Sequence, residues 1–491
     1  MKHYTEIIQS ALLCVLLLAS CGGRPTNARQ SNQLPKIFPD YIGVTIPAEI
    51  APMDFDCTSP FDRLWLEVRG SKGGSLQTGG KTIDMDVDEW HALTRQNRGG
   101  TLSFTLYVKR QGQWTRYRSF TMTVSRYPLS DWGLTYRRIA PGYEVYGRMG
   151  IYQRCLADFT EEPVIENTVA PGACLNCHTQ NRTSPDAFTF HVRGQQGATF
   201  IRVGGHDEWL PAKDSIIHGS MVYPYWHPSG RYVAYSTNKT HQSFHAVRSE
   251  RIEVFDQASD VFVYEPAKHR FILDSVLMTK DHYETYPVFS PDGRTLYFCS
   301  SVAEPIPSRY KAVRYNICRI TFDPARGRFV GPVDTIFNAR KMGKSAIHPR
   351  PSYDGRYLMF TLADYGCFPI WHKEADNWLL DLRTMKARPL RKANSNNTDS
   401  WHNWSIGSHW FVFTSRRIDG LYTRLYLCCI DDQGREAKPF LLPQRHPLNY
   451  YADLMCSYNT PDFTSRKVRF DQHAAGEAIR SGKRTEQTLM R

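Results

Sequence analysis

Two cysteines and a histidine stand in the order Cys174-Leu175-Asn176-Cys177-His178. Two thiols three positions apart can each add to a vinyl group of one porphyrin, and the adjacent histidine can then ligate the iron. The other uses of such a pair are a disulfide or half of a zinc site, but the sequence has no second pair with this spacing to complete four zinc ligands. The motif therefore predicts one covalently bound haem c, with thioether bonds at Cys174 and Cys177 and His178 as the proximal iron ligand.

The second axial ligand of the iron, on the side opposite His178, determines the function of such a haem. A methionine or a second histidine would give a low-spin electron carrier, whereas an open position would allow ligand binding or peroxide chemistry. The candidates are Met149, His191, His241 and His245. We expect His191 or Met149 to be the distal ligand, because both lie near the motif in the sequence.

The N-terminus predicts export and a lipid anchor. Lys2 and His3 precede a short apolar run that ends in Leu18-Ala19-Ser20-Cys21, which resembles a bacterial lipobox. We expect residues 1–20 to be a signal peptide, Cys21 to carry lipid and residues 21–39 to be a flexible tether. The alternative is an ordinary secretory peptide that is cut after Ser20. The predicted location is the cell envelope of a Gram-negative bacterium, as an outer-membrane lipoprotein on either face.

Composition narrows the class of protein. The 491 residues carry a net charge of +13, with 13% aromatic residues, 33 glycines and 29 prolines, which favours many short strands and turns. We assign the positive charge to a solvated exported surface and not to nucleic-acid binding; the alternative is a surface that meets anionic lipid or an acidic redox partner. Residues 464–491 are expected to form a frayed basic tail. Among the other cysteines, Cys299 and Cys318 are the one pair for which we predict a disulfide.

A repeated hairpin fills the C-terminal half. Three copies turn at Gly230, Gly293 and Gly355, and a degenerate fourth copy spans residues 402–414. Each copy is a strand, a tight turn and an aromatic-rich strand, and such hairpins must stack or circle to bury both faces. The spacing predicts a β-propeller of five to seven blades over residues 201–463.

Two further regions precede the propeller. Residues 62–69 and 102–124 alternate with period two, which predicts a small β-sandwich-like domain over residues 40–128. Residues 129–200 are expected to be a connector that carries the haem motif. The predicted fold is therefore mainly β, with an N-terminal sandwich, a haem-binding connector and a C-terminal propeller.

The repeats resemble the PD40 (WD40-like) propeller repeats of the TolB family. The whole arrangement is similar to exported bacterial lipoproteins that are often labelled TolB-like or cytochrome c biosynthesis proteins and combine such repeats with one C-x-x-C-H motif. The matching stretches are residues 150–154, 174–179, 190–194, 238–242 and 399–405. The resemblance implies architecture and haem more firmly than an activity.

A propeller mouth is the other candidate site. The residues that could line it are His227, His241, His245, Asp399, His402 and Arg424. The same residues could equally form a structural hydrogen-bond network that braces the blades. No G-x-S-x-G, Walker or H-E-x-x-H motif is present, so we predict no catalytic residue.

Three functions follow from these features. The first is an envelope-anchored c-type haem protein that transfers electrons or senses a ligand, with the propeller as a docking platform. The second is a TolB-like propeller that binds a protein or glycan partner, with a structural haem or none. A haem enzyme that uses the propeller mouth is the third.

Overall fold

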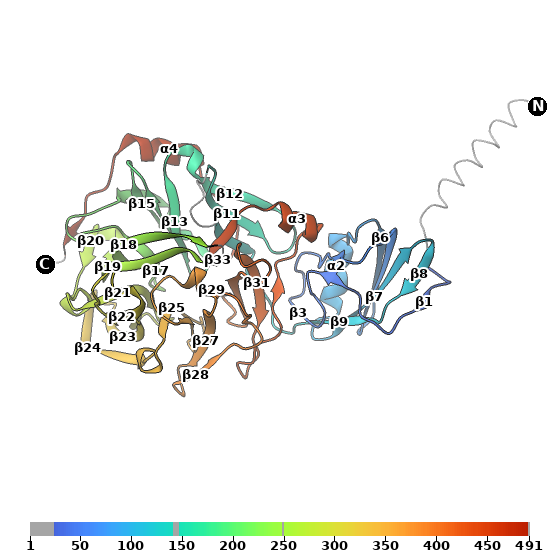
Figure 1. The fold of residues 1–491 in the computed structure, drawn as a ribbon. Helices are drawn as coiled ribbons and strands as arrows, with labels where there is room; N and C mark the ends of the chain where they lie inside the picture. The colour runs from blue at the N-terminus through green and yellow to red at the C-terminus, as the bar shows by residue number, and fades with distance from the viewer. Residues whose placement is uncertain (1–23, 141–146, 248–249, 490–491) are drawn as a thin grey trace, which may run out of the picture.

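The computed structural model describes residues 24–140, 147–247 and 250–489, so the predicted signal peptide and Cys21 lie outside the described residues. Six sheets of four or five strands stand in a ring, and a smaller N-terminal domain lies beside it (Figure 1). Within the described ranges no helix is both long and apolar enough to cross a bilayer. The fold is mainly β, as predicted, and the six sheets fall within the predicted five to seven blades.

The N-terminal domain is one mixed sheet of seven strands with a second layer on one side. Its strands are β1 (Arg29–Gln30), β3 (Thr45–Ile46), β5 (Arg63–Gly70), β6 (Ser75–Gly80), β7 (Thr101–Arg110), β8 (Gln113–Arg116) and β9 (Phe120–Val124). The second layer contains α2 (Val87–Gln96), which is capped by Asp86 and buries Trp90 against Phe104, and a short pair of strands, β2 (Ile37–Phe38) and β4 (Asp56–Cys57). A helix therefore supplies part of the layer for which we expected a second sheet.

The first two blades form where we predicted a connector. The first contains β33 (Ser457–Thr464), β10 (Gly133–Ile139), β11 (Gly150–Cys155) and β12 (Glu161–Glu166), and the second contains β13 (Cys174–Asn181), β14 (Ser184–Arg193), β15 (Ala198–Val203) and β16 (His206–Pro211). Because these eight strands lack the repeated turn, the prediction of a connector over residues 129–200 was wrong.

The other four blades contain the repeats. Their strands are β17 (Val222–Trp226), β18 (Val233–Val247), β19 (Glu250–Glu265) and β20 (Arg270–Ile272); β21 (His282–Phe289), β22 (Thr295–Val302), β23 (Asn316–Asp323) and β24 (Arg328–Phe337); β25 (Ser345–Pro351), β26 (Tyr357–Ala363), β27 (Asp376–Asp381) and β28 (Lys386–Pro389); and β29 (Asp399–Trp404), β30 (Trp410–Ser415), β31 (Arg424–Cys429) and β32 (Phe440–Leu441). The turn glycines Gly230, Gly293 and Gly355 have φ of 74°, 72° and 72°, and in the degenerate copy Ser408 takes the left-handed position.

The ring closes through the C-terminal strand. After β32 and α3 (Pro447–Asp453) the chain returns as β33, which pairs with β10 of the first blade. Neighbouring blades bury both faces of a sheet, so inner strands such as β26 are buried along their whole length and are apolar except for Thr361. The closed ring leaves no open edge between the first and last blades, which explains why residues 133–139 and 457–464 must fold together.

The C-terminal segment is ordered, contrary to the frayed tail that we predicted. Helix α4 (Gln472–Ser481) buries Ala475 and Ile479 in the core shared by the first two blades, and β34 (Thr488–Leu489) pairs with β20. Part of the predicted tether is also ordered, because β1 pairs with β8. Apolar positions spaced four residues apart in the tail gave this helix a face to bury.

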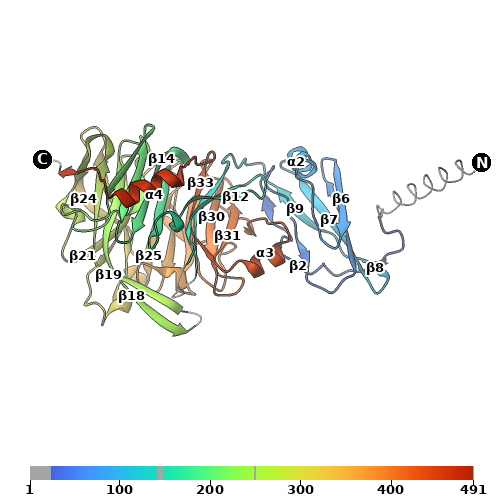
Figure 2. The same cartoon turned by 90° about the horizontal axis from the view of Figure 1, so that it is seen from above.

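The two parts of the molecule share one core. Tyr41 of the N-terminal domain donates a hydrogen bond to the carbonyl of Leu441 (3.0 Å), and the indole of Trp410 donates to the carbonyl of Tyr127 (3.2 Å). Both views show the N-terminal domain beside the blade that contains β31 (Figure 2). The domain is therefore packed on the propeller and not merely tethered to it.

The predicted disulfide between Cys299 and Cys318 is wrong. Both are free thiols, although their strands β22 and β23 are neighbours. Cys299 lies opposite Ile317, whereas Cys318 lies opposite Phe298, so the two thiols point to opposite faces of the blade.

Candidate functional site

The C-x-x-C-H motif lies on β13, the innermost strand of the second blade. All six innermost strands shift register at the same level, and one residue at each shift has a left-handed backbone. These residues are Cys177, Tyr223, Tyr286, His348, Trp401 and Thr460, with φ between 45° and 54°. We call this set the waist ring. Such strained non-glycine positions persist only where the surroundings enforce them.

Aromatic contacts connect the waist ring from blade to blade. Ring centroids are 4.2 Å apart for Tyr223 and Tyr286, 4.5 Å for Tyr286 and His348, and 4.0 Å for His348 and Trp401. The backbone of Tyr223 hydrogen-bonds to the thiol of Cys177, which places the second motif cysteine in the same ring. The propeller is thus filled at its waist by side chains from successive blades.

The two motif thiols lie near two guanidinium groups. Arg137 donates a hydrogen bond to the sulfur of Cys174 (3.2 Å), and Asn176 donates another (3.7 Å). Burial raises the pKa of the Cys177 thiol, and the positive charges of Arg193 and Arg137 oppose that rise. Both residues are partly exposed, but the thiol of Cys177 is buried, so only Cys174 presents the accessible sulfur that a reaction needs.

His178 is in a different environment. Its side chain is 5% exposed and lies against Phe188 between the first two blades, and neither ring nitrogen makes a hydrogen bond of normal geometry to a described residue. Burial lowers its pKa to about 4, so the imidazole is neutral at physiological pH. An unpaired neutral imidazole is a competent metal ligand, but its nitrogens are covered.

The residues fit haem c in type but not in placement. A porphyrin bonded to both thiols must also reach His178, yet His178 is packed between β10 and β14 while Cys177 points into the waist ring. Among the described residues, no group of three or more His, Cys, Asp or Glu side chains is placed to hold a metal ion. Haem attachment would therefore require the contact between the first two blades to open around His178.

The predicted distal ligands do not face His178. The sulfur of Met149 accepts a hydrogen bond from the backbone N–H of Leu175 (3.3 Å) inside the core. His191 is bonded to the hydroxyl of Thr199 (2.9 Å), and burial lowers its pKa to about 3. His191 follows Phe188 by three positions in one strand, so it points to the opposite face from the one that His178 contacts. This arrangement gives no support to either residue as the distal ligand, and the assignment stays a prediction.

The predicted residues of the propeller mouth are scattered. His227 bonds to Ser229 and to the carbonyl of Gly293 (3.0 Å) and braces a turn, whereas His241 stacks on Phe255 and lies with His245 on the β18–β19 hairpin. This arrangement gives no support to a metal site at His241 and His245.

The other three predicted residues of the propeller mouth, Asp399, His402 and Arg424, stabilise contacts within and between the blades. Asp399 forms a buried ion pair with Arg417 (2.7 Å), and His402 bonds to Asn377 (3.0 Å). Arg424 donates to three backbone carbonyls, of Tyr451, Leu454 and Cys456. The prediction that these residues meet in one site was wrong, and the structural interpretation holds for them.

A long hairpin covers the face at which the innermost strands begin, here called the front face. Strand β17 pairs with β18 only as far as Ser236, while β18 and β19 continue to pair up to Val247 and Glu250. The hairpin crosses the ring of blades in Figure 1 and stands out from the body in Figure 2. It begins in the third blade and contacts loops of the fourth and fifth.

Two buried acids of β19 attach the hairpin to those loops. Glu253 accepts a hydrogen bond from the hydroxyl of Tyr365 (2.7 Å) and contacts the imidazole of His372 (3.3 Å). Asp256 accepts hydrogen bonds from Tyr315 and from the thiol of Cys367 (both 3.4 Å). We call these contacts the latch.

Asp256 links the latch to the waist ring. Its second carboxylate oxygen is buried without a hydrogen bond to any described residue, and burial raises its pKa to about 6. Tyr286 of the waist ring donates to the carbonyl of Cys367 (2.9 Å). Sequence reasoning missed Glu253, Asp256 and Cys367, because acids inside a long strand carry no motif, although a 16-residue strand is itself unusual for a blade.

No family model matches the sequence, and no curated protein matches it either. Several solved structures have a fold similar to that of this chain. TolB from Acinetobacter baumannii has a TM-score of 0.43 and 12% identity over 78% of this chain and 86% of that chain. An oligogalacturonate lyase in complex with manganese has a TM-score of 0.36 and 11% identity over 63% of this chain and 74% of that chain. A puromycin-hydrolyzing peptidase of Mycobacterium tuberculosis has a TM-score of 0.36 and 12% identity, over 83% of this chain and 56% of that chain. At these scores the similarities carry no functional argument.

Proposed function

We propose that the protein is a propeller binding module of the bacterial cell envelope, which engages a partner protein through the β18–β19 hairpin on its front face. One observation carries the proposal: an arm anchored by buried acids extends from the propeller and exposes large apolar side chains. Phe244 is 58% exposed and Val247 is 52% exposed, both close to the end of the arm. Exposed apolar groups on a projecting element are typical of contact surfaces.

The ribbon geometry favours a protein over a glycan. Beyond Ser236 the hairpin has only two strands, so the outer edges of both leave backbone N–H and C=O groups without a strand neighbour. Such edges can add a strand from a partner, while neighbouring apolar side chains enter its pockets. A glycan would instead be expected to use the aromatic waist ring, which is largely buried beneath the latch.

The test compares two variants for retention of envelope components. Phe244→Ser combined with Val247→Ser removes the exposed apolar side chains of the arm, and Val330→Ser removes another exposed valine (44%) from β24 as a control. We expect a solubilised envelope protein that cross-links to the wild type and to Val330→Ser, but not to the double variant. Equal cross-linking by the double variant, or retention on purified peptidoglycan alone, would overturn the assignment.

Covalent haem c is the second proposal. It rests on the spacing of Cys174, Cys177 and His178 and on the buried imidazole of His178, whose ring nitrogens have no hydrogen-bond partner among the described residues. The group, when bound, would supply one-electron chemistry or ligand binding. Anchoring through a lipid on Cys21 likewise stays a proposal.

A further inference from the structure

A pocket of about 500 Å³ lies on the fourth blade, away from the hairpin tip and the C-x-x-C-H motif. It runs across all four strands of that blade, because the lining residues are register neighbours on one face: Glu284 lies opposite Ser300, and Ser300 lies opposite Asn316. The segment before β21 adds Val276 and Thr279 to its wall. Its size is that of a site for a small molecule.

One end of the pocket carries an acid that lacks a full set of partners. Glu284 is 2% exposed, and Thr279 donates a hydrogen bond to one of its oxygens (2.8 Å). The other oxygen is buried and has no hydrogen bond to any described residue. Leaving such an atom unpaired is costly, so a donor from a ligand would be favourable here.

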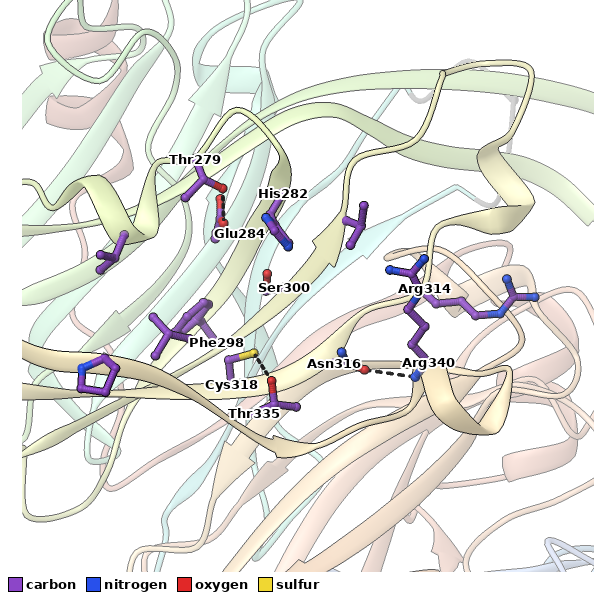
Figure 3. Close-up of a pocket in the computed structure, with 14 residues that line it drawn as sticks. Thr279, His282, Glu284, Phe298, Ser300, Arg314, Asn316, Cys318, Thr335 and Arg340 are labelled. Carbon is purple, nitrogen blue, oxygen red and sulfur yellow. Dashed lines mark hydrogen bonds between the residues drawn. The ribbon is translucent and has the colours of Figure 1, made fainter.

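The other end of the pocket is basic, and apolar side chains form part of its wall. Figure 3 shows Thr279 and Glu284 on one side and Arg314 and Arg340 on the other, with Ser300 and Asn316 between them and Phe298 on the side of the acid. Three valines of the lining are more than a third exposed: Val276 (41%), Val302 (37%) and Val333 (36%). The pocket therefore has a buried acid at one end, an exposed basic rim at the other, and apolar side chains in its wall.

We propose that this pocket binds a small zwitterion of the amino-acid or dipeptide class. The ammonium group meets Glu284, the apolar side chains lie on Phe298 and the valines, and the carboxylate faces Arg314 and Arg340. Burial raises the pKa of Glu284 to about 7, with help from Asp260, so the acid gains a full charge when a cation binds beside it. This site is independent of the proposed partner contact on the hairpin.

Calorimetric titration of the full chain with the dipeptide Leu-Leu tests the proposal. N-acetyl-Leu-Leu lacks the ammonium and Leu-Leu amide lacks the carboxylate, so each reports on one end of the pocket. We expect Leu-Leu to bind more tightly than either capped form. Glu284→Gln should weaken Leu-Leu roughly tenfold, the value of a charge-assisted hydrogen bond, and change the binding of N-acetyl-Leu-Leu less than twofold.

A second pair of variants protects the test against misfolding. Arg340 is exposed on the rim, so Arg340→Ala should keep the fold and weaken Leu-Leu but not its amide. Arg319→Ala removes an arginine from β23 that points to the other face of the same blade and should have no effect. Absence of Leu-Leu binding, or equal Leu-Leu affinity in the wild type and Arg340→Ala, would overturn the proposal.

Discussion

The latch predicts how firmly the hairpin is held on the front face. Tyr365→Phe removes one hydroxyl, whose hydrogen bond to the buried carboxylate of Glu253 is 2.7 Å long. A hydrogen bond to a charged group contributes about 1.5–3 kcal/mol, which corresponds to a change of about 10- to 140-fold in an equilibrium constant. An isolated two-stranded hairpin is only marginally stable, so a hairpin released from the latch also opens and exposes its backbone amides to solvent.

Hydrogen exchange measures this directly. We expect the amides of residues 238–247 and 250–256 to exchange about 10- to 140-fold faster in Tyr365→Phe, while those of β26 keep the wild-type rate. Tyr310→Phe is the matched control, because Tyr310 stacks on Phe255 and the phenylalanine retains that ring contact (5.4 Å). Equal exchange of the hairpin in Tyr365→Phe and Tyr310→Phe would refute the latch.

Three further predictions follow. Asp54 is fully buried, and burial raises its pKa to about 8. Because the carboxyl ionises more readily in the unfolded chain, its contribution to stability falls as the pH rises from about 4 to 8. In urea unfolding, Asp54→Asn should therefore stabilise the protein by about 2.5 kcal/mol more at pH 7 than at pH 5, and a pH-independent difference would contradict this. If haem is attached, protein made together with the attachment machinery should retain haem-peroxidase stain on denaturing gels, and Cys174→Ala or Cys177→Ala should lose it; a wild type that never stains would end the haem proposal. Cys21→Ser should release the protein from the membrane fraction, and a variant that stays bound would mean that lipid on Cys21 is not the anchor.

Local patterns in the sequence determined the strands and turns. The alternation in residues 63–69 and 102–124 and the turns at Gly230, Gly293 and Gly355 depend on neighbours within about ten residues, and each formed as expected. The mainly β class and the range of blades followed from them. The same local logic found four blades and missed two, because the first two lack the glycine turn.

Tertiary structure decided where the chemistry lies. Ring closure pairs residues 133–139 with residues 457–464, and no local pattern encodes a partner so distant in the chain. That closure turned the predicted connector into two blades and placed the C-x-x-C-H motif on an innermost strand, with His178 between blades. The tertiary structure also determined which buried acids are fully paired. Asp399 forms an ion pair with Arg417, whereas Asp256 and Glu284 each keep a buried oxygen without a hydrogen-bond partner among the described residues. A side chain's charge is written in the sequence, but its solvation and its partners depend on which distant segments pack around it.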